Sequence, residues 1–277
     1  MTALVLGGGG TVGRAWLSGL ITGLRANGID LSQSELIVGT SAGAVAGAQL
    51  ALGMDLAAIV TEEVRNPGPV IYPPDATARL AGLLGDMTAA NNAPDPDQAR
   101  AAIGAKALAA DTVSEEVFLS RPMYAVLAGK PWPAALRVTS VSATTGQLAV
   151  WSKDSGVELA NAVASSTALP GLSPAVTLNG DRHLDGGVRS MLNADLAAGA
   201  QSVIVVSCFP ITERDDIAQR EFDAITSAGG SLTIIDPGTE IRELTGNGAR
   251  MLDLTLIPGA LQIGRRQADI EAARLAQ

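Results

Sequence analysis

Residues 36–52, LIVGTSAGAVAGAQLAL, contain the elements that decide the fold: an apolar run, a turn around one serine, and a stretch of small apolar residues. Residues 36–38 are predicted to form a buried strand. Residues 44–52 are predicted to form a helix, which Gly53 ends. A strand that turns sharply into a helix is one half of a parallel α/β unit.

The N-terminal segment has the same order of elements. Residues 3–6 are an apolar run that leads into glycines 7–10, and the apolar side chains that follow recur at helical spacing; these are Leu17, Leu20, Ile21 and Leu24. Two consecutive strand, glycine-turn and helix units predict an α/β fold with a largely parallel, buried sheet. Further strands are predicted at residues 136–142, 147–151, 175–178, 182–184, 203–207 and 232–235. Asn179 and Gly180 are predicted to form a tight hairpin turn, and residues 259–277 a polar helix that packs on the sheet edge.

The composition excludes several classes of protein. The chain has 277 residues, a net charge of -9 and no basic cluster larger than Arg265 and Arg266, so its field repels nucleic acid and anionic lipid surfaces. We expect no nucleic-acid partner and at most transient contact with a membrane surface. Cys208 lies in an apolar run, which predicts a buried thiol, and the N-terminus lacks the features of a signal peptide. These features favour a cytoplasmic location.

A different pattern occupies the middle of the chain. From about residue 66 to residue 133, prolines and two short Ala-rich helical stretches replace the alternation of strands and helices. We interpret residues 1–277 as one domain with a helical cap or lid inserted at about 66–133; the alternative is a surface excursion with no role in the site. Leu80, Leu83, Leu84 and Met87 suit either an amphipathic lid that meets lipid or the inner face of a packed helix.

The glycine loop at residues 8–13 follows a strand and opens a helix, so its backbone amides lie at the positive end of the helix dipole. Two anions suit such a loop. One is a dinucleotide pyrophosphate, because the loop fits G-x-G-x-x-G and Asp30 follows at about the distance expected of a ribose-binding acid. The other is the oxyanion that forms when a carbonyl is attacked.

The motif Gly39-Thr40-Ser41-Ala42-Gly43 favours the oxyanion. It is a G-x-S-x-G between a buried strand and a helix, which is the context in which this motif holds a serine nucleophile in a strained turn. Gly39 and Gly43 leave room for that turn. The helix N-terminus beside Ser41 stabilises a developing alkoxide.

The base that would activate Ser41 has few candidates. The only histidine, His183, precedes Asp185 by two positions on a predicted strand, which does not fit the order of a Ser-His-Asp triad in α/β-hydrolases. This favours a carboxylate acting directly on the serine, and Asp185 with Gly186 and Gly187 supplies one. A simple strand-ending turn is the alternative for Asp185. His183 is expected to be a partly exposed strand residue, or else to tune Asp185 or touch the substrate.

Taken together, the glycine loop, the G-x-S-x-G on the next strand and the later Asp-Gly-Gly resemble the patatin-like phospholipase family. The resemblance implies a three-layer α/β/α sandwich around a mixed, largely parallel sheet, and lipid acyl esters as substrates. It also implies that Gly8, Gly9 and Gly10 form an oxyanion hole. Ser41 and Asp185 would form a Ser-Asp dyad that needs neither a metal nor a cofactor.

Weaker features also match the family, namely the Ala-Ser pair at residues 164–165 ahead of Pro170, and Asn193 after the Asp-Gly-Gly turn. One position departs from its pattern: Val12 stands where Arg or Lys is usual, with Arg14 close by. We interpret the chain as a serine acyl hydrolase of phospholipase A, lysophospholipase or general esterase type. Two alternatives stay open, a weakly active or inactive lipid- or protein-binding member of the same fold, and a dinucleotide-binding protein.

Overall fold

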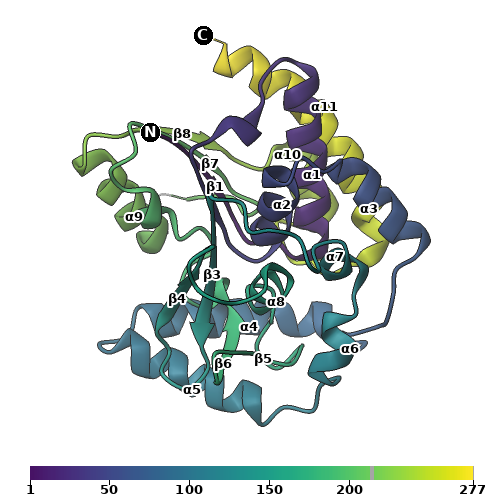
Figure 1. The fold of residues 1–277 in the computed structure, drawn as a ribbon, viewed down its shortest axis with the longest axis vertical. Helices are drawn as coiled ribbons and strands as arrows, with labels where there is room; N and C mark the ends of the chain where they lie inside the picture. The colour runs from purple at the N-terminus through teal and green to yellow at the C-terminus, as the bar shows by residue number, and fades with distance from the viewer. Residues whose placement is uncertain (213–214, 277) are drawn as a thin grey trace.

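A computed structural model describes residues 1–212 and 215–276 and centres on a mixed sheet, ordered β5-β6-β3-β2-β1-β7-β8 with β4 also paired to β3 (Figure 1). The strands are β1 (Thr2–Leu6), β2 (Leu36–Gly39), β3 (Leu136–Ser142), β4 (Leu148–Trp151), β5 (Val176–Leu178), β6 (Asp181–Asp185), β7 (Ser202–Val206) and β8 (Ser231–Ile235). The pairs that run from β3 through β2, β1 and β7 to β8 are parallel, and the remaining pairs are antiparallel. The expected mixed, mostly parallel sheet is therefore confirmed.

Helices cover both faces of this sheet. One face carries α1 (Gly10–Ala26), α2 (Ala42–Ala51), α3 (Leu56–Arg65), α8 (Leu159–Ser165), α10 (Thr239–Thr245) and α11 (Ile257–Leu275), and the other carries α9 (Asp216–Ser227). In β1, Leu4 and Leu6 pack into the first layer, and Ala3 and Val5 pack toward the second. Because both faces are covered, the central strands β1, β2 and β7 are mostly apolar and read as continuous apolar runs.

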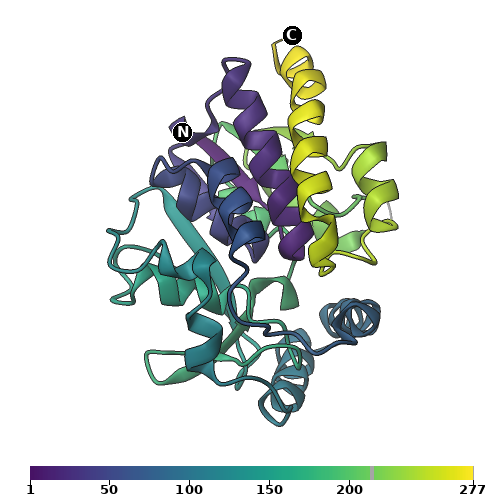
Figure 2. The same cartoon turned by 90° about the vertical axis from the view of Figure 1, so that its right-hand side faces the viewer.

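Helix α11 packs along α1, so the prediction that the last segment packs on the sheet edge is wrong in its main contact (Figure 2). Glycines bring the two backbones together. A Cβ at Gly19 would lie 2.1 Å from the Leu261 carbonyl oxygen, and a Cβ at Gly264 would lie 2.1 Å from that of Trp16. The small residues on facing helix surfaces therefore decide where α11 docks.

The middle segment forms α4 (Ala76–Asn91), α5 (Pro96–Leu108), α6 (Glu115–Leu119) and α7 (Pro122–Ala125), which is more helix than the two Ala-rich stretches predicted. These helices gather around the β3, β5 and β6 end of the sheet (Figure 1). Helix α5 approaches the sheet closely, because a Cβ at Gly104 would lie 2.0 Å from the Ala143 carbonyl oxygen. Within the described ranges, every helix is too short or too polar to cross a membrane.

Strand β3 brings distant parts of the chain together. Ser140 and Val141 pair with both β4 and β6, so these two strands lie on opposite edges of β3. Strand β2 shares an edge with β6, and it pairs up to Gly39 opposite Val138, while β6 ends with Asp185 opposite Ser140. Because β2 is parallel to β3 and β6 is antiparallel, their carboxyl ends point toward each other and meet.

Candidate active site

Ser41 lies in the tight turn between β2 and α2, with φ 54° and ψ -118°. A non-glycine residue rarely adopts a positive φ, and such strain costs about 1–3 kcal/mol. The flanking glycines are required by close packing, because a Cβ at Gly39 would lie 2.6 Å from the Ala44 Cα and one at Gly43 would lie 1.9 Å from the Leu6 carbonyl oxygen. The turn thus presents the serine hydroxyl at the carboxyl end of β2.

Asp185 lies directly against Ser41. The Ser41 hydroxyl donates a hydrogen bond of 2.7 Å to Asp185 Oδ2, and the Gly187 amide donates one of 2.7 Å to Asp185 Oδ1. Asp185 is 1% exposed. Burial raises the pKa of this carboxyl to about 7, although the hydrogen bonds from Ser41 and Gly187 act in the opposite direction. A serine paired with a buried carboxylate is one arrangement that activates a nucleophile.

The glycine loop presents backbone amides beside Ser41. The Gly8 amide donates to the Met191 carbonyl oxygen at 2.8 Å, and a Cβ on Gly8 would lie 3.4 Å from the Ser41 Cβ. The amides of Gly9 and Gly10, by contrast, donate no hydrogen bond to any described residue. They lie at the N-terminus of α1, where the helix dipole favours negative charge. Two free donors are therefore available to an anion.

Cys208 explains why Gly9 has no side chain. A Cβ on Gly9 would lie 2.4 Å from the Cys208 Cβ, and the thiol is buried, as its apolar surroundings in the sequence predict. The thiol packs under the loop and holds its backbone close to the end of β7. The role of Cys208 is therefore structural support of the glycine loop.

Asn193 links the turn that contains Ser41 to the loop that follows Asp185. Its side-chain amide donates to the Thr40 hydroxyl at 3.0 Å and to the Ser190 carbonyl oxygen at 2.8 Å, and its backbone is left-handed. The Arg189 guanidinium donates to Asn193 Oδ1 at 2.8 Å. These bonds fix the segments that carry Ser41 and Asp185 relative to each other.

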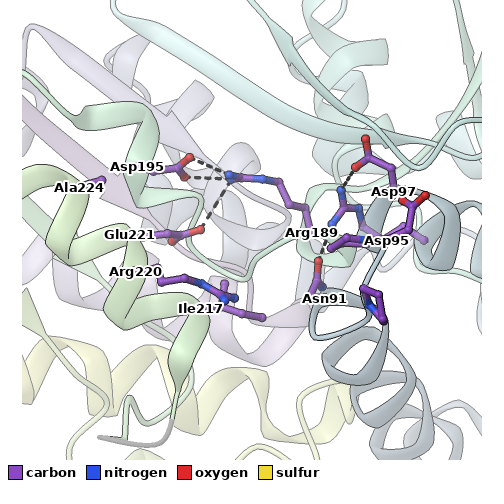
Figure 3. Close-up of a pocket in the computed structure, with 12 residues that line it drawn as sticks. Asn91, Asp95, Asp97, Arg189, Asp195, Ile217, Arg220, Glu221 and Ala224 are labelled. Carbon is purple, nitrogen blue, oxygen red and sulfur yellow. Dashed lines mark hydrogen bonds and ion pairs between the residues drawn. The ribbon is translucent and has the colours of Figure 1, made fainter.

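Arg189 in turn is held by two acids at a wide polar cavity of about 700 Å³, drawn in Figure 3. It forms a bidentate pair with Asp195 at 2.9 and 2.7 Å, and lies 3.7 Å from Glu221. Burial raises the pKa of Glu221 to about 7. The cavity lies between α5 and α9 and is not lined by Ser41 or Asp185. No local pattern in the sequence pointed to Arg189 or Glu221.

Two small cavities flank Ser41, each of about 20 Å³. We call the first the arginine cavity; it is lined by Arg14, Arg121, Tyr72 and Thr167 among others. We call the second the apolar cavity; it is lined by Asp185 and by Leu80, Leu84, Leu169, Met191, Phe209, Met251 and Leu252 among others. A volume of 20 Å³ is about that needed for one water molecule. Both cavities are narrow, and α4 supplies part of the cover of the apolar cavity.

His183 differs from the expectation of partial exposure, because it is 5% exposed. Its Nδ1 lies 3.1 Å from the Ser140 hydroxyl, and its ring packs edge-on against Trp151 with centroids 4.9 Å apart. Burial lowers its pKa. Neighbouring strands cover His183 from both sides, and it has no hydrogen bond with Ser41 or Asp185.

Asp30 does not take the position that a dinucleotide site requires. It caps the short helix Leu31–Gln33 ahead of β2 and accepts hydrogen bonds from the Ser32 amide and hydroxyl, which lower its pKa to about 2. A ribose-binding acid follows the second strand of such a fold. The described residues also contain no cluster of His, Cys, Asp and Glu that could hold a metal ion.

A family model described as Patatin-like phospholipase matches residues 4–198. Among solved structures, VipD from Legionella pneumophila is similar, with 15% identity, a TM-score of 0.40, and coverage of 94% of this chain and 67% of VipD. The type III effector protein ExoU is also similar, with 19% identity and a TM-score of 0.30. This match covers 95% of this chain and 53% of ExoU. No curated protein matches the sequence.

Proposed function

The chain belongs to the patatin-like phospholipase family, whose members are typically lipid acyl hydrolases, and from this premise we propose that it hydrolyses lipid carboxylic esters through an acyl-enzyme on Ser41. The observation that carries the proposal is the 2.7 Å hydrogen bond from Ser41 Oγ to Asp185 Oδ2. The strained turn that holds the serine and the two free amides of the glycine loop support it.

In the acylation step, the Asp185 carboxylate accepts the Ser41 proton while Oγ attacks the ester carbonyl carbon. The carbonyl oxygen becomes an oxyanion, which the amides of Gly9 and Gly10 stabilise. The protonated Asp185 then donates its proton to the alcohol oxygen as the ester C–O bond breaks. The alcohol leaves and the acyl group stays on Ser41.

Deacylation uses the same base. Asp185 accepts a proton from a water molecule whose oxygen attacks the acyl-enzyme, and returns a proton to Ser41 Oγ when the carboxylic acid leaves. A carboxyl pKa of about 7 suits this role, because a base is most effective when its pKa lies close to the working pH. His183 takes no part in the scheme.

The apolar lining of the apolar cavity favours an acyl chain as the part of the substrate that lies beside Asp185. Leu80 and Leu84 of α4 form its cover, so the apolar face of this helix points inward toward Ser41. The closed volume requires that α4 move away before a chain can bind. Phospholipase A, lysophospholipase and general esterase activity all use this chemistry, so the chain length and headgroup must be measured.

Fluorophosphonate labelling, with peptide mapping of the modified residue, tests the proposal. We expect the label on Ser41, and hydrolysis of p-nitrophenyl esters that Ser41→Ala and Asp185→Asn both abolish. The exposed residues Ser120 and Asp154 provide the matched controls Ser120→Ala and Asp154→Asn, which should label and turn over like the wild type.

Three results would contradict the proposal. A label on a serine other than Ser41 would show that the nucleophile is elsewhere. Retained hydrolysis in folded Asp185→Asn would exclude Asp185 as the base. No labelling of the folded wild type by small, reactive fluorophosphonates would favour the inactive lipid- or protein-binding alternative.

A further inference from the structure

The arginine cavity beside Ser41 contains a buried guanidinium that forms no ion pair with any described residue. Arg121, at the start of α7, is 8% exposed. One of its nitrogens, Nη1, donates to the Tyr124 hydroxyl at 3.3 Å, and its guanidinium carbon lies 5.8 and 5.7 Å from the ring centroids of Tyr72 and Tyr124. In the described part of the chain, no carboxylate forms an ion pair with it.

The tyrosines beside Arg121 do not supply the missing negative charge. Burial raises the pKa of the Tyr72 hydroxyl to about 12 and also raises that of Tyr124, so both are neutral at physiological pH. Their rings attract the guanidinium, but a neutral ring does not balance its charge. Arginine side chains stay protonated in proteins, so Arg121 keeps its positive charge.

Arg14 adds a second guanidinium to the same cavity. It is 2% exposed and forms an ion pair with Glu63 through Nη2, while its Nε and Nη1 are buried without a hydrogen-bond partner. Glu63 pairs with Arg14 and also acts on Arg121 through space, so a single carboxylate serves two buried guanidinium groups. Leaving a buried charge and buried N–H donors unpaired costs several kcal/mol, and such groups in a native site are normally matched by a partner or a ligand.

We propose that the arginine cavity binds an anionic group of the substrate, a phosphate or a carboxylate, and that Arg121 is a specificity-determining residue. This inference rests on the proposed function. Guanidinium groups suit both anions because their N–H donors match two oxygens at once. The substrate is then an anionic acyl ester, with its acyl chain in the apolar cavity and its acid on the opposite side of Ser41.

The positions of the two cavities fit one substrate across the nucleophile. Ser41 and Gly10 line both cavities, so an ester carbonyl at Ser41 places its acyl and alcohol parts on opposite sides. Tyr72 and Arg121 come from the middle segment, as do Leu80 and Leu84 of α4. The same segment therefore covers both parts of the substrate, and it must move outward because 20 Å³ is too small for a phosphate.

Three soluble octanoyl esters that differ only in their alcohol part test the proposal. They are monooctanoylglycerol, which is neutral, its 3-phosphate, and the octanoyl ester of glyceric acid, which carries a carboxylate. For the wild type we expect kcat/KM to be about 10- to 100-fold higher for at least one anionic ester than for the neutral one. A preference for the phosphate ester, the carboxylate ester or both shows which anionic group the arginine cavity binds. Arg121→Gln should remove most of the preference, and Arg121→Lys should retain part of it.

Arg65→Gln is the matched control, because Arg65 is exposed on α3 and its replacement changes the charge equally. A second readout uses the wild type alone: octyl phosphate or octanoate should slow fluorophosphonate labelling of Ser41, and octanol should do so much less. Equal kcat/KM for the three esters, or a preference that survives Arg121→Gln, would overturn the inference. Failure of labelling and of all hydrolysis would instead remove the proposed function on which it rests.

Discussion

Replacing Asp185 with asparagine should abolish hydrolysis and, at the same time, make the protein more stable at alkaline pH. The wild-type carboxyl is buried, and its pKa is raised from an ordinary value of 3.8 to about 7. Between these two values the folded protein holds a proton that the unfolded chain releases. The free energy of unfolding therefore falls as the pH rises through this window, and levels off above about pH 7.

The size of the effect follows from the same two values. Each pH unit between them costs about 1.4 kcal/mol, so the ionised carboxylate destabilises the folded protein by up to about 4 kcal/mol at pH 8. Asparagine cannot ionise, and its side-chain oxygen can still accept the hydrogen bond from the Gly187 amide. The stability of Asp185→Asn relative to the wild type should therefore increase between pH 4 and pH 8 by an amount of this order.

Urea unfolding at several values of pH measures this difference. Glu221, whose pKa is also raised to about 7, contributes the same trend to both proteins and cancels in the comparison. Asp154→Asn, at an exposed site, should follow the wild type throughout. A stability difference between Asp185→Asn and the wild type that does not change with pH would refute the reasoning, because the carboxyl would then titrate at its ordinary value.

Three further predictions concern activity and packing. Because Asp185 must be ionised to accept a proton, kcat/KM for a neutral ester should rise about tenfold per pH unit and level off near pH 7; a profile that is flat from pH 5 to pH 8 would contradict this. Gly43→Ala places a Cβ 1.9 Å from the Leu6 carbonyl oxygen, so it should prevent folding or destabilise the protein by more than about 3 kcal/mol. Gly82→Ala, in open space within α4, should instead stabilise the protein by up to about 1 kcal/mol. Thermal unfolding of both variants measures the difference. Asn193→Ala removes the side-chain hydrogen bond to Thr40 and places alanine in a left-handed backbone conformation, which asparagine tolerates better. It should lower kcat and destabilise the protein by about 2 kcal/mol. Wild-type kcat and stability would be evidence against the linking role of Asn193.

Much of the sheet could be predicted from the sequence because β1, β2 and β7 are nearly continuous apolar runs and because glycine or asparagine turns bound several of the other strands. The predicted strands match the observed ones to within a residue or two, and Asn179 and Gly180 both have the positive φ of the expected hairpin turn. Order along the chain, however, does not determine order in the sheet. Nothing in the local pattern shows that β6 pairs with the second half of β3, along the same edge whose first half pairs with β2.

The serine, the acid and the glycines could be found from the sequence because each needs a particular backbone, and glycine marks that backbone. Part of the cover was also predicted, because the helical spacing of Leu80 and Leu84 pointed to a lid or to an inner helix face. The rest of the cover could not be found in this way. Tyr72 and Arg121 lie outside any motif, and only tertiary packing brings them to Ser41. The burial of His183 was missed for a related reason, since the residues that enclose it, Trp151 and Ser140, come from two other strands.

The meeting of β2 and β6 along one edge of β3 separates two tasks within a single chain. The distance between Ser41 and Asp185 is set by the pairing of Gly39 with Val138 and of Asp185 with Ser140, and no residue of the middle segment takes part in that pairing. Side chains of the middle segment that do not pack on β3 or β6 can therefore change without altering that pairing. Under the proposed function, the fold can change which ester it admits during evolution while the chemistry that breaks the ester stays the same.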